Sequence, residues 1–258
     1  MRDNNVSGGI RFFEFEVFKG HPEIVHGVFT RLGGVSPAPF DSLNTSFSTG
    51  DDPEHVSENR TRIRQALDAE SVPVYINQVH GNRTVEVDQV FDRGGNSPPE
   101  ADAMMTKQAR RLLVIQVADC QSVMMFDREK RVAANVHAGW RGSVRNILGK
   151  CIEHMAARFR TRPKDIVAGV GPSLGPCCAQ FINYEKEIPP HLHTYRTKED
   201  GVLFDFRQMS ADQMVQKGVR AGNIEFMDIC TKCRPDLFYS YRRDGVTGRF
   251  ASAIGILN

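Results

Sequence analysis

Apolar residues along this chain fall into short runs that change between strand-like and helix-like spacing. Three runs rich in β-favouring residues end near Gly or Asp: IVHGVFTRLGG at 24–34, VIQVADCQSVMMFD at 114–127 and RVAANVHAGWRG at 131–142. Such runs predict strands. Further strands are expected at 165–171, at 224–229, and in the segments LFYSYRR at 237–243 and RFASAIGIL at 249–257.

Longer stretches carry apolar residues at helical spacing. Asp52 is a predicted N-cap, Pro53 follows at the first helical position, and Val56 and Ile63 lie on one face of the helix that begins there. An apolar stripe that runs from 141 to 159 predicts one continuous helix. The stripe comprises Val144, Ile147, Leu148, Cys151, Ile152, Met155 and Phe159, so Cys151 is expected to be a core side chain. A further helix is expected at 206–220.

Hairpins and crossover helices mix in this order of elements. That mixture favours an α+β class with mixed α/β layers, in which mixed β-sheets have flanking helices, over a doubly wound sheet. With 258 residues, 40% of them hydrophobic and 25% charged, the chain can bury a large core. We expect a single domain over residues 1–258, with residues 1–20 as a loosely ordered N-terminal segment.

Charge and hydropathy exclude some classes of binding partner. The formal net charge of +2 provides no strong field for nucleic acid or for a membrane surface. No apolar stretch approaches the roughly 18 residues of a membrane span, and the polar start MRDNNVSGG differs from a signal peptide. We therefore expect a cytoplasmic protein that binds neither nucleic acid nor membranes.

Three residues form a candidate metal site: His80 in NQVHG, Cys120 in ADC and His137 in HAGWRG. A thiolate and two imidazoles suit Zn²⁺ and leave a fourth position for water or substrate. Copper could use the same ligands with a weak axial Met, for which Met124 and Met125 are available. Ligand type alone leaves zinc and copper open, although a multinuclear copper oxidase would need more clustered histidines than this chain has.

The two later segments are expected to form a hairpin around the polar turn DREK at 127–130. If Asp127 pairs with Lys130, Cys120 lies directly opposite His137. Opposed side chains in a hairpin have Cβ atoms roughly 4.5 to 5.5 Å apart and point to one face, which suits a shared metal or a Cys/His catalytic pair.

Six cysteines are few for a chain of this length, and a reducing compartment favours thiols or metal ligands over disulfides. Cys230 and Cys233 form a single CxxC pair, which is a weak metal signal. Cys177 and Cys178 are adjacent and are expected to be buried or to line a site. The roles of these four cysteines are left open.

Longer motifs run through the chain: FTRLGGVS at 29–36, SLN at 42–44, GDDPEHVSENR at 50–60, ADAMMT at 101–106, GPSLGPCC at 171–178 and FYSYRRDGVTGR at 238–249. With these motifs and the three above, the sequence resembles the laccase-domain family of purine nucleoside phosphorylases, long labelled polyphenol oxidases. The resemblance runs from about residue 25 to the end. It implies a zinc-dependent enzyme that acts on purine nucleosides and inorganic phosphate.

The implied reactions are phosphorolysis of adenosine, inosine and methylthioadenosine, and deamination of adenosine. The family's zinc ligands correspond to His80, Cys120 and His137, which are then also the catalytic residues. The family's fold is likened to bacterial toxin deamidases that use a Cys/His pair. A cysteine hydrolase with Cys120 as nucleophile and His137 as base therefore stays open. So do a copper-dependent polyphenol oxidase and a non-catalytic metal-binding or redox protein, and the oligomeric state is undetermined.

Substrate-binding candidates follow from the reaction. Four arginines are candidates for phosphate and ribose, because guanidinium groups bind phosphate in bidentate fashion. They are Arg31, Arg141, Arg242 and Arg243. Two amides, Asn44 and Gln78, are candidates for contacts to the base or the sugar.

Overall fold

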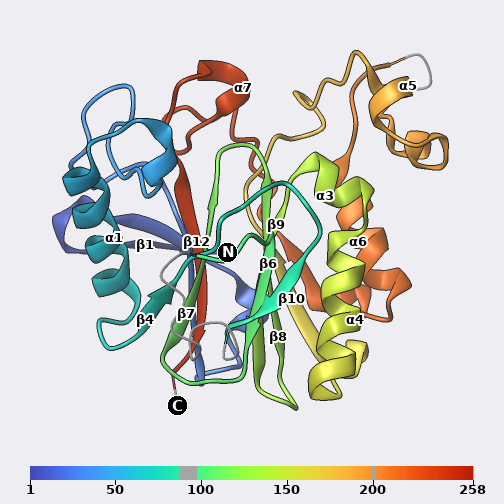
Figure 1. Cartoon of the computed structure of the whole chain (residues 1–258), viewed down its shortest axis with the longest axis horizontal. Helices are drawn as coiled ribbons and strands as arrows, with labels where there is room; N and C mark the ends of the chain where they lie inside the picture. The colour runs from blue at the N-terminus through green and yellow to red at the C-terminus, as the bar shows by residue number, and fades with distance from the viewer. Residues whose placement is uncertain (88–97, 199–200, 258) are drawn as a thin grey trace.

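The computed structural model describes residues 1–87, 98–198 and 201–257, and the strands in these ranges form two six-stranded sheets (Figure 1). In spatial order the first sheet contains β1 (Arg2–Asn5), β2 (Arg11–Glu14), β3 (Ile24–Phe29), β12 (Phe250–Ile256), β7 (Arg111–Val117) and β4 (Val72–Val74). The second contains β11 (Ile224–Phe226), β10 (Ile166–Val170), β8 (Gln121–Asp127), β9 (Val132–Ala138), β6 (Ala103–Thr106) and β5 (Thr84–Glu86). Each sheet mixes parallel and antiparallel neighbours, which confirms the predicted α+β class.

The sheets pack face to face and helices cover their outer faces. Helix α1 (Pro53–Leu67) packs on the first sheet, whereas α4 (Ile147–Phe159) and α6 (Phe206–Gln216) lie on the side of the second (Figure 1). Between the sheets, Leu113 and Ile115 of β7 share one apolar core with Met124 and Phe126 of β8. Alternate residues of these strands contact the outer helices, so both faces of each strand are buried. This explains why the sequence of each strand is a continuous apolar run.

The other helices of the described ranges are short. They are α3 (Trp140–Val144), α5 (Tyr184–Glu187), α7 (Tyr241–Asp244) and the 3-10 helices Ser7–Gly9, Glu16–Phe18, Phe47–Thr49, Pro163–Asp165, Pro190–Tyr195 and Ala221–Asn223. No described helix is both long and apolar enough to pass through a lipid bilayer.

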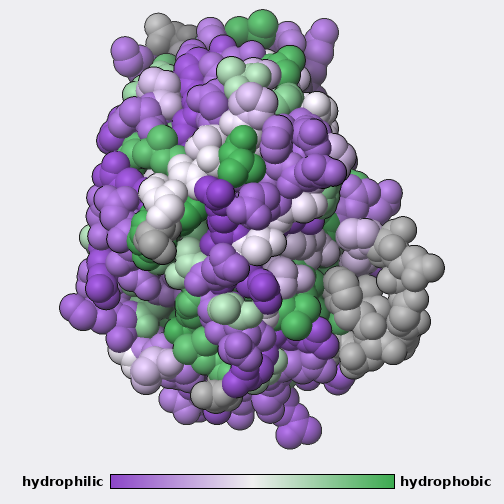
Figure 2. Space-filling model, turned by 90° about the vertical axis from the view of Figure 1, so that its left-hand side faces the viewer, coloured by the Kyte–Doolittle hydropathy of each residue, from purple (hydrophilic) through white to green (hydrophobic). Residues whose placement is uncertain are grey.

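Helix α1 begins where the sequence predicts. The side chain of Asp52 accepts a hydrogen bond from the backbone N–H of Glu54, and Pro53 occupies the first turn. Val56 and Ile63 are buried on its inner face. Figure 2 shows that the side of the molecule carrying α1 is mainly hydrophilic, with apolar residues in small scattered groups, as an amphipathic surface helix requires.

The prediction of one helix over 141–159 is wrong. The stretch forms α3 and α4, separated at Asn146, whose backbone is left-handed with φ of 55°. The Asn146 side chain accepts a hydrogen bond from the N–H of Gly149 and so caps α4. Cys151 is fully buried in α4, which confirms its expected place in the core. The helix expected at 206–220 is α6, which ends at Gln216.

Residues 1–20 are not loosely ordered, contrary to expectation. β1 pairs with β2 and β2 pairs with β3, so this segment forms one edge of the first sheet. Phe13, Phe15 and Phe18 are buried in the core between the sheets. The aromatic side chains, rather than the polar first residues, decide the order of this segment.

Two predicted strands also differ from the structure. The run at 114–127 is divided between β7 and β8, which belong to different sheets. The segment at 237–243 is no strand, because Tyr239 donates a hydrogen bond to the carbonyl of Phe40 and Ser240 caps α7. The strands expected at 24–34, 165–171 and 249–257 are confirmed as β3, β10 and β12.

His26 on β3 is a buried polar residue in the core. Its Nε2 accepts a hydrogen bond of 2.8 Å from the backbone N–H of Phe15, and its ring packs against Phe18. Burial lowers the pKa of His26 to about 4. The folded protein therefore contains a neutral imidazole under conditions in which the unfolded chain begins to protonate it.

We predict that this imidazole makes folding sensitive to mild acid. Below the unfolded pKa of about 6.5 the unfolded state binds the extra proton, so stability falls between pH 6.5 and 4. Between pH 7 and pH 5, the free energy of unfolding of the wild type, measured in urea, should fall by about 2 kcal/mol more than that of His26→Gln. The amide of the variant can accept the same N–H. Equal pH dependence in the two proteins would contradict the assignment.

Candidate active site

The structure brings His80, Cys120 and His137 together at one end of the two sheets. His80 lies in the loop between β4 and β5, Cys120 in the turn from β7 to β8, and His137 near the end of β9. One Nδ1 or Nε2 atom of each histidine and the Sγ atom of Cys120 all lie within 4.8 Å of one another. Three segments distant in sequence therefore present their donor atoms to one point.

Left-handed backbone conformations shape two of these segments. The chain leaves the first sheet after Val117 and enters the second at Gln121, and Asp119 in this turn has φ of 88°. His80 has φ of 57°. Positive φ values are uncommon outside glycine. Here they turn the chain sharply enough to place His80 and Asp119 at the site.

The hairpin register differs from the predicted one. Asp127 pairs with Val132, and Ser122 rather than Cys120 lies opposite His137. The cause is the turn: Asp127 Oδ1 accepts hydrogen bonds from the N–H groups of Glu129 and Lys130, which stabilises a longer loop. The shift is an even number of residues, so the β8 positions that face His137 keep the same parity.

Asp102 orients both histidines. Its Oδ1 lies 2.7 Å from His137 Nδ1 and accepts a hydrogen bond of 2.9 Å from the backbone N–H of His80. Its Oδ2 accepts a hydrogen bond of 2.6 Å from Gly81. Sequence reasoning missed Asp102; the signal was an acidic residue inside the ADAMMT motif, directly before a buried strand.

Cys120 and His137 stabilise each other's charge. Burial alone would raise the pKa of the Cys120 thiol, but the charge and hydrogen bond of His137 and the hydrogen bond of His80 outweigh it and lower the pKa to about 6. Burial would lower the pKa of His137, yet the Cys120 thiolate and Asp102 raise it to about 9. The metal-free chain therefore holds a thiolate beside an imidazolium at neutral pH.

The donors fit a tetrahedral metal ion. Asp102 occupies Nδ1 of His137, which leaves Nε2 as its ligand atom, in the way carboxylates orient metal-bound histidines. His80 Nε2 lies 3.9 Å from Cys120 Sγ. Two ligands of one tetrahedral Zn²⁺, at about 2.0 Å for nitrogen and about 2.3 Å for sulfur, lie roughly 3.6 Å apart. Three protein donors would leave the fourth position open.

Gly139 permits this convergence. A Cβ atom at this position would lie 2.9 Å from Cδ2 of His80 and 3.2 Å from Sγ of Cys120. In the HAGWRG turn, the backbone at Gly139 therefore comes close to the side chains of all three residues of the candidate site. Any side chain at 139 would push these donors apart.

A cavity of about 620 Å³ opens over the three residues. Three of the predicted substrate-binding candidates, Gln78, Arg141 and Arg242, line it. The Gln78 amide pairs with the backbone N–H and carbonyl of Gln116, and the Arg141 guanidinium stacks on Trp140. Arg242 donates a hydrogen bond to the carbonyl of Gln180.

The structure does not bring the other three candidates to the cavity wall. Arg31 stacks on Tyr239 and pairs with Asp41. Arg243 pairs with Asp244 and donates to nearby carbonyls. Asn44 is fully buried, and its Oδ1 accepts a hydrogen bond from the N–H of Arg249.

Sequence reasoning missed several cavity residues. Arg249 lines the cavity from the end of the FYSYRRDGVTGR motif, and Asn44 holds its backbone in place. Ser46 and Ser48 bring two hydroxyl groups, and Tyr241 brings an exposed ring. The motif itself contained the signal, but the sequence does not reveal which of its arginines faces inward.

A family model described as multi-copper polyphenol oxidoreductase laccase matches residues 25–257. The chain belongs to this family. The purine nucleoside phosphorylase YfiH of Escherichia coli (strain K12) is 33% identical over 233 residues, covering 88% of this chain and 92% of that protein. The purine nucleoside phosphorylase YlmD of Bacillus subtilis (strain 168) is 29% identical over 252 residues, covering 92% and 90%. These matches confirm the resemblance seen in the motifs.

Solved structures agree with the sequence comparison. YlmD from Geobacillus stearothermophilus superposes with a TM-score of 0.87 at 30% identity, covering 99% of both chains. YfiH of Bacillus licheniformis, described as a hypothetical protein, has a TM-score of 0.85 at 27% identity, covering 98% of both chains. The two-sheet architecture is therefore that of the laccase-like family.

The family description mentions copper, so the methionines near the site matter. Met124 and Met125 are fully buried within β8, one in the core between the sheets and the other beneath α4. Neither belongs to the cavity wall. In this family member the two methionines proposed as axial copper ligands serve the apolar cores.

We predict that Cys120 in the metal-free protein is alkylated with a midpoint near pH 6. Replacing Asp102 by Asn should move this midpoint upward, because a neutral amide stabilises the His137 imidazolium less than a carboxylate does. The midpoint is measured from the rate of iodoacetamide modification as a function of pH, and peptide mass spectrometry assigns the rate to each cysteine. Cys151 should stay unreactive in the folded protein, and an unchanged midpoint in Asp102→Asn would contradict the prediction.

We also predict that Gly139→Ala disrupts the metal site. The added methyl group collides with His80 and Cys120, so bound metal should fall well below that of the wild type. Gly222→Ala is the matched control, because a Cβ atom there meets open space. Metal content measured after gel filtration decides the matter; equal metal in both variants would show that the site tolerates the methyl group.

Proposed function

We propose that this protein is a zinc-dependent purine nucleoside phosphorylase. Its substrates are adenosine, inosine and methylthioadenosine with inorganic phosphate, and it also deaminates adenosine. The observation that carries the proposal is the position of His80, Cys120 and His137 in a cavity that arginines and aromatic rings also line. The names of the curated relatives support the same reaction class.

The arginines of the cavity suit a phosphate. The guanidinium residues of the cavity lining are Arg141, Arg242 and Arg249. In the described part of the chain, none of them forms an ion pair with a carboxylate. Arg249 donates to the carbonyls of Thr247 and Gly248, and burial lowers its pKa. A bound phosphate dianion would accept bidentate hydrogen bonds from these guanidinium groups.

The rest of the cavity suits a nucleoside. A volume of about 620 Å³ is ample for a purine nucleoside together with phosphate. Trp140 and Phe181 pack edge to face at 5.7 Å, and Tyr241 exposes its ring at the rim, so aromatic surface is available to a purine base. Ser46 and Ser48 offer hydroxyl groups for the sugar.

The chemistry asks mainly for positioning and charge. Phosphorolysis breaks the bond between ribose C1′ and the purine nitrogen, forms a bond from C1′ to a phosphate oxygen, and gives the purine a proton. The arginines hold the phosphate, and Asp102 keeps His137 and His80 oriented. Zinc held by His80, Cys120 and His137 would supply Lewis acidity and lower the pKa of bound water, as deamination at C6 requires.

One observation favours a second function. Cys120, His137 and Asp102 form a row of thiolate, imidazolium and carboxylate, which is the arrangement of a cysteine nucleophile with its base and orienting group. A cysteine hydrolase would need this thiolate free of metal. Metal occupancy of the active protein therefore separates the two functions.

The test measures zinc and turnover on one preparation. Base release from inosine should depend on phosphate, and Cys120→Ala should lose one zinc equivalent per chain and more than about 100-fold of the turnover. Cys151→Ala, at a fully buried position in α4, is the matched control and should keep both. Full turnover by metal-free protein, or base release that ignores phosphate, would contradict the proposal.

A further inference from the structure

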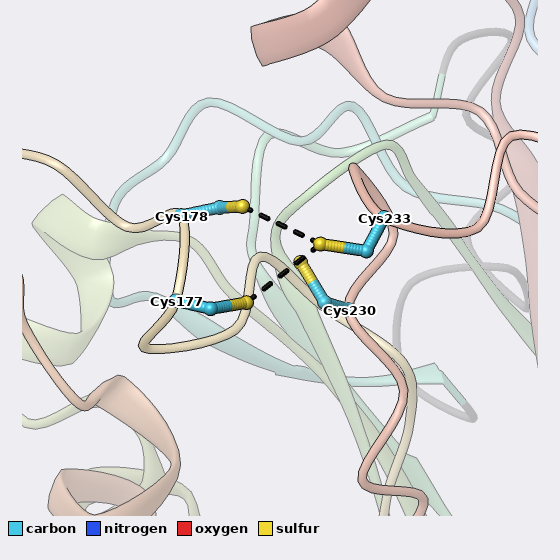
Figure 3. Close-up of side chains that lie close together, drawn as sticks. All are labelled: Cys177, Cys178, Cys230 and Cys233. Carbon is cyan, nitrogen blue, oxygen red and sulfur yellow. Dashed lines mark hydrogen bonds between the residues drawn. The ribbon is translucent and has the colours of Figure 1, made fainter.

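Four cysteines outside the cavity wall converge on a second point. Cys177 and Cys178 come from the segment after β10, and Cys230 and Cys233 come from the segment after β11. Figure 3 shows their side chains pointing toward one another from the two segments. All four Sγ atoms lie within 4.8 Å of one another, and all four thiols are free.

The spacing of the sulfur atoms matches a tetrahedral ion. Sγ of Cys233 lies 3.8 Å from Sγ of Cys177 and 3.5 Å from Sγ of Cys178. Four sulfur ligands at about 2.3 Å from one Zn²⁺ lie roughly 3.8 Å apart. Four thiolates this close repel one another strongly unless a cation lies between them, and soft thiolate ligands select ions such as zinc.

The backbone around the cluster supports ligand sulfurs. β10 and β11 are parallel neighbours, so the segments that follow them begin at the same end of the second sheet. The N–H of Gly175 donates a hydrogen bond of 3.3 Å to Sγ of Cys230, which favours a thiolate there. A Cβ atom at Gly175 would lie 3.1 Å from Cβ of Cys230 and 3.4 Å from Sγ of Cys177, so this glycine leaves room for the cluster.

We propose that Cys177, Cys178, Cys230 and Cys233 bind a second zinc ion. Four protein ligands complete a tetrahedral sphere, so this site is closed and structural rather than catalytic. Each thiol that binds releases its proton to solvent. Cys177 and Cys233 are exposed, which gives the ion a path of entry. The proposal does not depend on the nucleoside chemistry at the other site.

The second ion would fasten a segment of the cavity wall to a segment that contacts the turn containing Cys120. Ser173 and Leu174 precede Cys177, Ala179 and Phe181 follow Cys178, and all four line the cavity. On the other segment, Thr231 donates a hydrogen bond of 2.7 Å to Asp119, the neighbour of Cys120. Zinc at the cluster would therefore fix the position of the cavity wall relative to the turn that contains Cys120.

The test uses cobalt in a background that lacks the first site. Cys120→Ala, stripped and reloaded with Co²⁺, should bind one equivalent and show intense thiolate-to-cobalt absorption. Adding Cys177→Ser and Cys230→Ser should abolish both, whereas adding Cys151→Ala should leave both unchanged. The Cys177→Ser, Cys230→Ser double variant with Cys120 intact should keep one equivalent at the first site. Equal cobalt absorption with and without the two serines would overturn the proposal.

A second measurement needs no variant. In the zinc-loaded full chain, Cys177, Cys178, Cys230 and Cys233 should resist iodoacetamide, and a chelator should make them reactive. Equal modification before and after chelation would refute the site. A disulfide between the two segments in a non-reducing digest of freshly purified protein would refute it as well, because an oxidised pair cannot bind the ion.

Discussion

One buried carboxylate, that of Asp102, determines the geometry of the candidate active site. Its oxygens accept hydrogen bonds from the backbone of His80 and Gly81 and contact Nδ1 of His137. A buried carboxylate is costly unless such partners surround it, and these partners come from two segments, 80–81 and 137, that are remote from each other and from Asp102 in sequence. Satisfying Asp102 therefore means bringing the two histidines together, whether or not a metal is bound.

Much of the fold could be predicted from the sequence because its strands and helices carry local signals. Asp52 and Pro53 mark the start of α1, and the apolar stripe after Trp140 marks a helix on the second sheet. The break at Asn146 could not be predicted, since its left-handed conformation depends on its cap with Gly149 and on the packing around it. Periodicity reports which face is apolar, and it does not report where a chain turns.

The site illustrates the same limit. The ligand types of His80, Cys120 and His137 are visible in the sequence, but their convergence depends on a chain that changes sheets at Asp119. The predicted register pairs Cys120 with His137, whereas the longer turn stabilised by Asp127 shifts the observed register by two residues. The even shift preserves the facing side, so Cys120 and His137 still lie close together although the predicted register is wrong.

Asp119 connects the two sulfur-containing clusters. Its carboxylate accepts hydrogen bonds from Thr231, which lies between Cys230 and Cys233, and from the backbone N–H of Arg242 at the cavity wall. Its carbonyl accepts a hydrogen bond from Leu174. An open three-donor cluster can exchange ligands and do chemistry, whereas a closed four-thiolate cluster can only hold its segments. If zinc closes the four-thiolate cluster as proposed, the hydrogen bonds of Asp119 to Thr231 and Leu174 would carry that constraint to the turn that contains Cys120.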